Sequence, residues 1–155
     1  MGATFESLAP GDRIEGTAFA VSRASIRAFC EASLDYNPLH LDDDYMRGRF
    51  GKTQFDGVIM HGMTNFGLVT RMLTDWAYAA DAVHRRLETR WLKPVKPGDT
   101  IRPSGTVAAK QTTAKSRWVT IEVEIRNQRD ETVATGQALV EFPLSGAKAA
   151  SFSRP

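Results

Sequence analysis

The stretch that decides the fold is GMTNFGLVTRMLTDWAYAA, residues 62–80. Its spacing predicts a helix that is apolar on nearly all sides, with charges only late, at Arg71 and Asp75. A helix without a polar face has to be buried by the structure around it. His61 and Asn65 make the segment too polar to span a membrane, and it is interrupted too soon. We therefore expect a long helix inside the protein and no membrane partner.

After this helix the sequence changes to a period of two. Residues 85–93, 100–110, 117–126 and 132–142 read as strands. Residues 119–125 alternate strictly between apolar and polar, which is typical of an antiparallel sheet with one covered face. That covered face is the obvious partner of the buried helix. The predicted class is α+β, with a curled antiparallel β-sheet wrapped around a long central α-helix.

The residues upstream predict two shorter helices. Residues 12–21 alternate loosely, and Ser22 is a plausible N-cap for a helix that runs to about Ala32. A short helix with acidic residues at its start is expected from about Leu41 to Arg47. Cys30 lies on the apolar side of the first helix, so we expect a buried thiol rather than a nucleophile.

Length and composition bound the class of protein. The 155 residues predict one domain, 1–155, with a loosely ordered tail over about residues 144–155. A formal net charge of +2 is too small to indicate nucleic acid as a partner. A single cysteine excludes an internal disulfide and suits a reducing compartment. The first residues lack the pattern of a signal peptide, and we expect a cytoplasmic protein.

The segment SLDYNPLH, residues 33–40, is the strongest candidate for chemistry. Asp35 and His40 lie five residues apart, and Pro38 biases Asn37 away from helical backbone angles. The chain must therefore turn between the two titratable side chains, which can bring both to one small volume. The alternative is an ordinary loop in which Asp35 only caps the preceding helix.

This segment, together with IMHGM at residues 59–63, resembles the MaoC-like hydratase/dehydratase family of hotdog-fold proteins. The family pattern is Ser-Gly-Asp-x-Asn-Pro-Leu-His, and Leu34 stands here where the family usually has glycine. PVKPGD, residues 94–99, resembles the family's turn between two strands. The resemblance covers roughly residues 10–143, with a few extra residues around Met46 to Gln54.

The resemblance implies a hotdog fold and a reversible hydration. Water would add across the trans-2 double bond of an enoyl thioester of coenzyme A or acyl carrier protein, giving an (R)-3-hydroxyacyl thioester. No metal or redox cofactor is implied. Asp35 and His40 match the family's catalytic pair. Gly62, at the start of the long helix, would donate its N–H to the thioester carbonyl as an oxyanion hole.

Further residues have weaker assignments. The family places a serine hydroxyl on the long helix to orient the carboxylate, and the corresponding position is Thr70; alternatively Thr70 bonds back to the Phe66 carbonyl. Asn37 is a second candidate for orienting Asp35, or it holds its own turn. A basic cluster in the extra segment is either a solvated loop or a contact for coenzyme A phosphates: Arg47, Arg49 and Lys52.

The remaining histidines and tryptophans have structural interpretations. We expect His61 to cap or pack the start of the long helix and His84 to lie in a loop. Three histidines without ligand spacing indicate no metal site. The tryptophans are expected in the core or in a dimer interface: Trp76, Trp91 and Trp118. Because a curled sheet leaves an edge to be covered, we expect a homodimer.

Three functions remain open from the sequence. A hydratase is favoured by the intact Asp35 and His40 pair. A hotdog acyl-CoA thioesterase would need a carboxylate aimed at the carbonyl carbon instead. A non-catalytic subunit that binds acyl thioesters is kept open by Leu34 and Thr70, which depart from the family pattern. Acyl chain length, the choice of carrier and the metabolic route are not encoded in any spacing.

Overall fold

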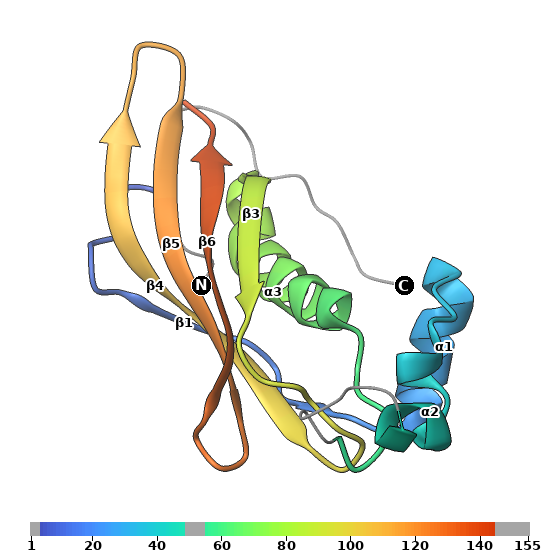
Figure 1. Ribbon diagram of the computed structural model, residues 1–155. Coiled ribbons are helices and arrows are strands. Elements are labelled where there is room, and N and C mark those ends of the chain that lie inside the picture. Colours follow the sequence, from blue (N-terminus) through green and yellow to red (C-terminus); the bar gives the residue numbers. More distant parts are fainter. Residues whose placement is uncertain (1–3, 49–54, 145–155) are drawn as a thin grey trace.

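A six-stranded antiparallel sheet curls around helix α3 (Gly62–Ala77) in the computed structural model, which describes residues 4–48 and 55–144 (Figure 1). The strand order is β1-β4-β5-β6-β3, and the short β2 also pairs with β4. The α+β class predicted from the sequence is confirmed. The strands are β1 (Arg13–Glu15), β2 (Phe19–Ala20), β3 (Val83–Trp91), β4 (Thr100–Thr112), β5 (Arg117–Asn127) and β6 (Thr132–Phe142).

The core lies between α3 and the inner face of the sheet. In β5 the buried residues alternate as the sequence predicts, with Val119, Ile121 and Val123 facing the helix side. Val69 and Leu73 of α3 are buried in the same core. Burying such side chains is worth about 1.5–3 kcal/mol each. The predicted helix over 62–80 ends in a 3₁₀ turn, η2 (Tyr78–Ala80), so its last turn is tighter than the rest.

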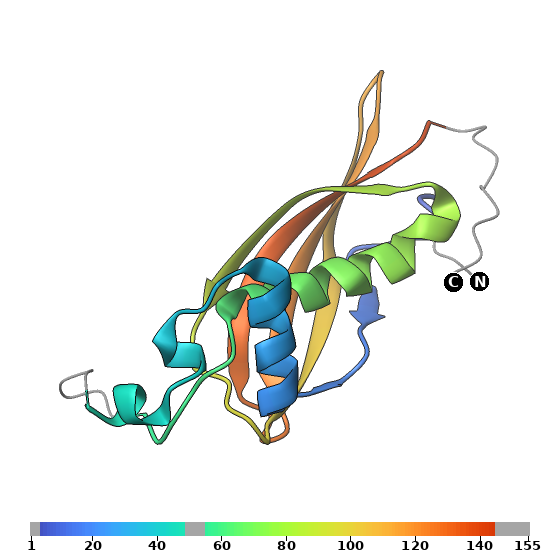
Figure 2. The same cartoon turned by 90° about the vertical axis from the view of Figure 1, so that its right-hand side faces the viewer.

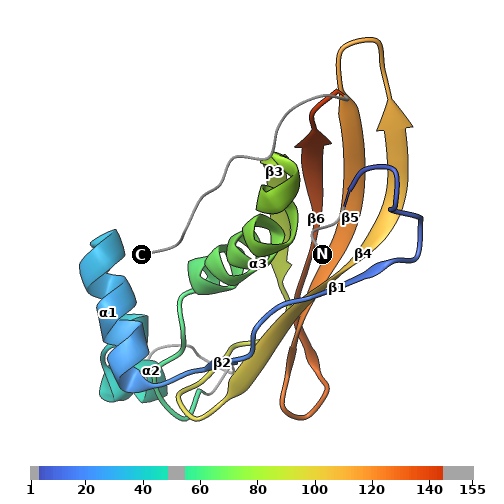
Figure 3. The same ribbon diagram turned by 180° about the vertical axis from the view of Figure 1, so that it is seen from behind.

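Two smaller helices lie beside the N-terminal end of α3, away from the sheet (Figures 2 and 3). Helix α1 (Arg23–Ser33) starts at a capping box in which the Ser22 Oγ accepts from the Ser25 N–H at 3.0 Å. Helix α2 (Asp43–Gly48) follows a 3₁₀ turn, η1 (Pro38–His40). Both predicted short helices are confirmed, and both lie next to the start of α3.

The carboxylate of Asp43 joins three of these segments. Its Oδ1 accepts from the Val58 N–H at 2.9 Å, and its Oδ2 pairs with Arg23 at 2.7 Å. The hydrogen bond from Val58 is the main cause of a pKa of Asp43 below its ordinary value, and the ion pair with Arg23 lowers this pKa further. Asp43 therefore links α2 both to α1 and to the chain that leads into α3.

The PVKPGD segment forms the turn between β3 and β4. Gly98 has φ +94°, a conformation that favours glycine, and the Asp99 Oδ2 accepts from the Lys96 N–H at 2.9 Å. The Val95 carbonyl accepts from the Met60 N–H at 2.8 Å. This turn therefore also fixes the chain two residues before α3.

One expectation about an individual residue changes. His84 lies in β3 rather than in a loop, because the ladder with β6 starts at Val83, two residues before the predicted strand. Of the two places expected for Trp91, the core is excluded, since 55% of it is exposed at the end of β3, and a dimer interface stays a prediction. The last residues of the predicted loose tail, 145–155, lie outside the described residues. Within the described part of the chain, no helix is long and apolar enough to cross a membrane.

Candidate active site

The turn over residues 33–40 brings Asp35 and His40 together. Helix α1 ends at Ser33, and the 3₁₀ turn η1 starts at Pro38. The backbone N–H of Asn37 donates to the Asp35 Oδ1 at 3.2 Å, while the side-chain Oδ1 of Asn37 accepts from the Leu39 N–H at 3.2 Å. Asn37 thus holds its own turn with its side chain and orients the carboxylate only through its backbone.

Leu34 takes the left-handed conformation that ends α1, with φ +60° and ψ +20°. Only glycine adopts this region without steric cost; for leucine the cost is about 1–2 kcal/mol. The side chain is 76% exposed and so gains little from packing. The family's usual glycine would fit this backbone without strain.

We expect Leu34→Gly to stabilise the protein. The relief of strain is partly offset because glycine has more freedom in the unfolded chain, so the free energy of unfolding rises by about 0.5–1 kcal/mol. For a chain of this size Tm rises by about 1–4 °C. Differential scanning calorimetry measures it, with Leu144→Gly, an exposed leucine near the chain end, as the matched control. A lower Tm in Leu34→Gly contradicts the expectation.

His40 is buried, and its tautomer follows from its partner. Its Nδ1 lies 2.7 Å from the Ile59 carbonyl oxygen, which can only accept, so Nδ1 carries the hydrogen. The neutral ring therefore keeps a lone pair on Nε2. Burial is the main reason that the pKa of His40 lies below its ordinary value. His61 lowers it further, whereas the Ile59 hydrogen bond and Asp35 oppose the shift.

His61 belongs to the same cluster. Its ring stacks on that of His40, with 3.6 Å between the ring centroids and 22° between the planes. Its Nε2 lies 3.1 Å from the backbone carbonyl oxygen of Asp35. One ring nitrogen from each histidine and a carboxylate oxygen of Asp35 all lie within 4.8 Å of one another. His61 does pack the start of α3, as expected, but its side chain makes no cap hydrogen bond.

Three such donors resemble a metal site in composition, but their geometry does not fit one. The two stacked imidazoles hold their in-plane lone pairs in nearly parallel planes, with 3.6 Å between the ring centroids, which does not suit convergence on one ion. Moreover, the Nδ1 of His40 and the Nε2 of His61 already contact backbone carbonyls. The arrangement suits hydrogen bonding and proton transfer better than metal binding.

Gly62 begins α3, where its N–H has no partner within the helix. A Cβ on Gly62 would lie 2.5 Å from the Cε2 atom of Trp91, so the indole ring packs directly on this glycine. The two residues share a pocket of about 250 Å³ with Asn65 and Val95. Glycine is required here for the close approach of Trp91, a contact that the sequence did not indicate.

The remaining predicted residues are not brought to the pair. The Oγ1 of Thr70 is buried without a hydrogen-bond partner, so it bonds neither Asp35 nor the Phe66 carbonyl. Thr70 lies about 12 Å beyond Gly62 along the helix axis, too far for the predicted contact with a group near the helix start. Arg47 contacts Asp44 at 3.3 Å. The other two members of the basic cluster, Arg49 and Lys52, lie outside the described residues.

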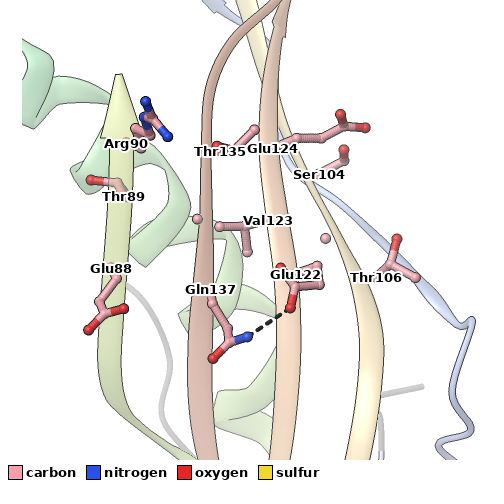
Figure 4. A pocket seen from close by; sticks show the side chains of 12 residues that line it. Glu88, Thr89, Arg90, Ser104, Thr106, Glu122, Val123, Glu124, Thr135 and Gln137 are labelled. Carbon is pink, nitrogen blue, oxygen red and sulfur yellow. Dashed lines mark hydrogen bonds between the residues drawn. The ribbon is translucent and has the colours of Figure 1, made fainter. Parts of the chain in front are cut away.

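A larger hollow, about 590 Å³, lies on the face of the sheet turned away from α3 (Figure 4). Polar side chains of β3, β4, β5 and β6 line it, and the Gln137 Nε2 donates to the Glu122 Oε1 at 2.8 Å. Of its charged side chains, Glu124 is half-buried and the others are exposed: Glu88, Arg90 and Glu122. Nothing in it matches the buried, converging donors beside α3, so the candidate site is the cluster at the helix start.

A curled antiparallel sheet wrapped around a central helix is the hotdog fold, and here a carboxylate and two imidazoles converge beside the start of that helix. The sequence profile of the MaoC like domain matches residues 6–129, most of the chain. The chain belongs to the MaoC-like family.

Two of the proteins that resemble this chain are hydratases, and a third is a regulatory protein. The (R)-specific enoyl-CoA hydratase of Rhodospirillum rubrum is 27% identical over 142 residues, which cover 92% of this chain and 93% of that protein. The solved (R)-hydratase from A. caviae, involved in PHA biosynthesis, has 27% identity and a TM-score of 0.75, covering 89% of this chain and 99% of that one. A monoamine oxidase regulatory protein from Archaeoglobus reaches 32% identity and a TM-score of 0.75, covering 91% and 94%.

Proposed function

We propose that this protein reversibly hydrates trans-2-enoyl thioesters of coenzyme A to (R)-3-hydroxyacyl thioesters. The observation that carries the proposal is the convergence of the Asp35 carboxylate and a His40 ring nitrogen within 4.8 Å. They adjoin the start of α3 through His61, which contacts both residues and precedes Gly62. Relatives that are (R)-specific enoyl-CoA hydratases support the same reaction class.

The two groups can hold one water molecule between them. The Asp35 carboxylate accepts one of its hydrogens, and the Nε2 lone pair of neutral His40 accepts the other. A lone pair of the water oxygen is then free to attack the β-carbon. As the C–O bond forms, one water proton passes to the pair, and the electrons of the double bond move toward the thioester carbonyl. The pair then returns that proton to the α-carbon.

The thioester carbonyl needs a partner while it carries negative charge. The N–H of Gly62 is free of intrahelical bonds and lies at the positive end of a 16-residue helix. Donors of this kind are worth about 10²–10³ in rate in other enzymes. The indole of Trp91 lies where a Cβ on Gly62 would point, so it limits the directions from which a thioester can approach.

The test is the hydration of crotonyl-CoA by the purified protein, followed as the loss of enoyl absorbance. Hydration without release of free thiol supports the proposal. Thiol release without hydration would favour a thioesterase instead. Binding without either reaction would favour a non-catalytic subunit, a role consistent with the regulatory protein among the similar structures. A series of enoyl-CoAs from short to long chains then defines the acyl group.

The pH dependence of kcat/KM should follow the protonation of the His40 ring. In the proposed mechanism neutral His40 accepts a hydrogen from water, so the rate rises with pH as this ring loses its proton. Because the folded pKa lies below the ordinary 6.5, the acid limb has its midpoint below pH 6.5. Stability moves in the same sense: the unfolded chain binds more protons below pH 6.5, so folding weakens as the pH falls through that window. A midpoint above 6.5 contradicts the assignment.

We also propose that the protein is a homodimer joined at β3. This strand pairs with β6 on one side and forms the end of the described sheet order. Its exposed face and end carry apolar side chains at Val83, Trp91 and Leu92. Pairing two copies along β3 would cover an open strand edge. Sedimentation equilibrium should give twice the mass of the chain, and a monomer at micromolar concentration contradicts the proposal.

A further inference from the structure

His61 is buried against two aromatic rings at the junction of α1, η1 and α3. Phe29 packs on it with 4.6 Å between the ring centroids and a tilt of 39°, and His40 stacks on it at 3.6 Å. Only 2% of His61 is exposed. These contacts restrict the plane of the His61 ring, which in turn limits the plane that His40 can adopt.

The hydrogen bonds of His61 determine its tautomer. The Asp35 carbonyl oxygen, 3.1 Å from Nε2, can only accept, so Nε2 carries the hydrogen. The Sγ of Cys30 lies 3.6 Å from the same nitrogen. The Nδ1 is buried without a hydrogen-bond partner. A buried unpartnered nitrogen costs about 1–3 kcal/mol, which packing alone would avoid with a phenylalanine.

We propose that His61 is a positioning residue for the hydration: it holds the His40 ring and the Asp35 backbone as one unit and favours the neutral form of His40. The inference rests on the proposed function and adds a third side chain to its machinery. His61 reaches both members of the pair, through the ring stack and through the carbonyl of Asp35. The next residue along the chain is Gly62.

The charges around His40 support the second part of this role. Burial lowers the pKa of His40 most, and the His61 ring stacked on it at 3.6 Å supplies part of that burial and disfavours a positive charge there, whereas Asp35 favours the protonated form. The thiol of Cys30, behind His61, is uncharged, because burial raises its pKa. Removing the His61 imidazole should therefore raise the pKa of His40.

Two substitutions separate the functions of the His61 ring. His61→Phe keeps a ring for stacking but loses the N–H to Asp35, whereas His61→Gln can keep an N–H and loses the stack. We expect kcat to fall about tenfold in His61→Phe and about 10²-fold in His61→Gln, with KM within about twofold. A displacement of a catalytic group by about 1 Å can cost about 10²-fold in rate, and the variant that keeps the ring stack should lose less. In both variants the acid limb of the pH profile should move to higher pH.

His84→Phe and His84→Gln are the matched controls. His84 also places its Nε2 near a backbone carbonyl, that of Arg86 at 3.0 Å, but in β3. These variants should leave the acid limb unchanged. A limb that does not move in either His61 variant, or a loss expressed mainly as a raised KM, overturns the inference.

A measurement on the resting protein separates this inference from the proposed function. NMR of ¹⁵N-labelled imidazoles should show the Nε2–H tautomer for His61 and the Nδ1–H tautomer for His40. The titration midpoint of His40 should move upward in His61→Phe. If it moves in a protein without hydratase activity, only the proposed function fails. If His40 titrates identically in wild type and both variants, the inference is wrong.

Discussion

Asp35→Asn and His40→Ala should each lower the hydration of crotonyl-CoA by about 10²–10⁴-fold. The asparagine keeps an oxygen that can accept from the Asn37 N–H at the 3.2 Å contact, so the turn should persist while the base is lost. His40→Ala removes the ring that carries the Nε2 lone pair and leaves the Ile59 carbonyl without its donor. Stopped-flow or steady-state absorbance measures both rates.

Matched controls keep these two variants interpretable. Asp44→Asn changes an exposed carboxylate on α2, and His84→Ala removes a histidine from β3; each should retain nearly the full rate. Circular dichroism and the sedimented mass should match wild type in all four proteins. Retention of most of the activity in both Asp35→Asn and His40→Ala would refute the acid–base assignment.

Gly62→Ala should have the second largest effect. The new Cβ would meet the indole of Trp91 at 2.5 Å, closer than side-chain atoms approach, so the ring must move. Trp91 is half exposed in the single chain, so the ring can move and the chain should still fold, and the sedimented mass reports whether the proposed dimer at β3 persists. The methyl and the displaced indole then alter the approach to the Gly62 N–H, and we expect kcat/KM to fall by about 10²-fold.

A double-mutant cycle tests the cause. Trp91→Leu removes the clash, so Gly62→Ala should cost much less activity in a Trp91→Leu background than alone. Gly67→Ala is the control, since a Cβ at this helical glycine would meet nothing within 4 Å. Equal losses from Gly62→Ala in both backgrounds would show that the indole contact is not the cause.

Much of the fold was predictable because its signals are local. Ser22 caps α1 through a hydrogen bond to a residue three positions on, and β5 alternates between buried and open side chains. The start of β3 was misplaced because the ladder is irregular between His84 and Arg86, which breaks the period of two. An edge strand with one partner also carries a weaker hydrophobic pattern.

The site was predictable only where one short segment contains it. Pro38 forces a turn between Asp35 and His40, and the structure brings the two side chains together. The contacts of His61 and Trp91 join segments that are distant in the sequence, and no spacing indicates those contacts. Thr70 shows the converse: counting along a helix identified the residue, but its Oγ1 lies buried without a partner.

The bonds of Asp43 bear on how this scaffold can be engineered. The Val58 N–H that it holds comes fifteen positions later in the sequence, so the intervening chain is closed at its base by a side-chain bridge. The same carboxylate also holds Arg23 of α1, so replacing Asp43 would release both bonds at once. Designs that keep Asp43 and alter exposed positions elsewhere should therefore leave the scaffold around the candidate site assembled.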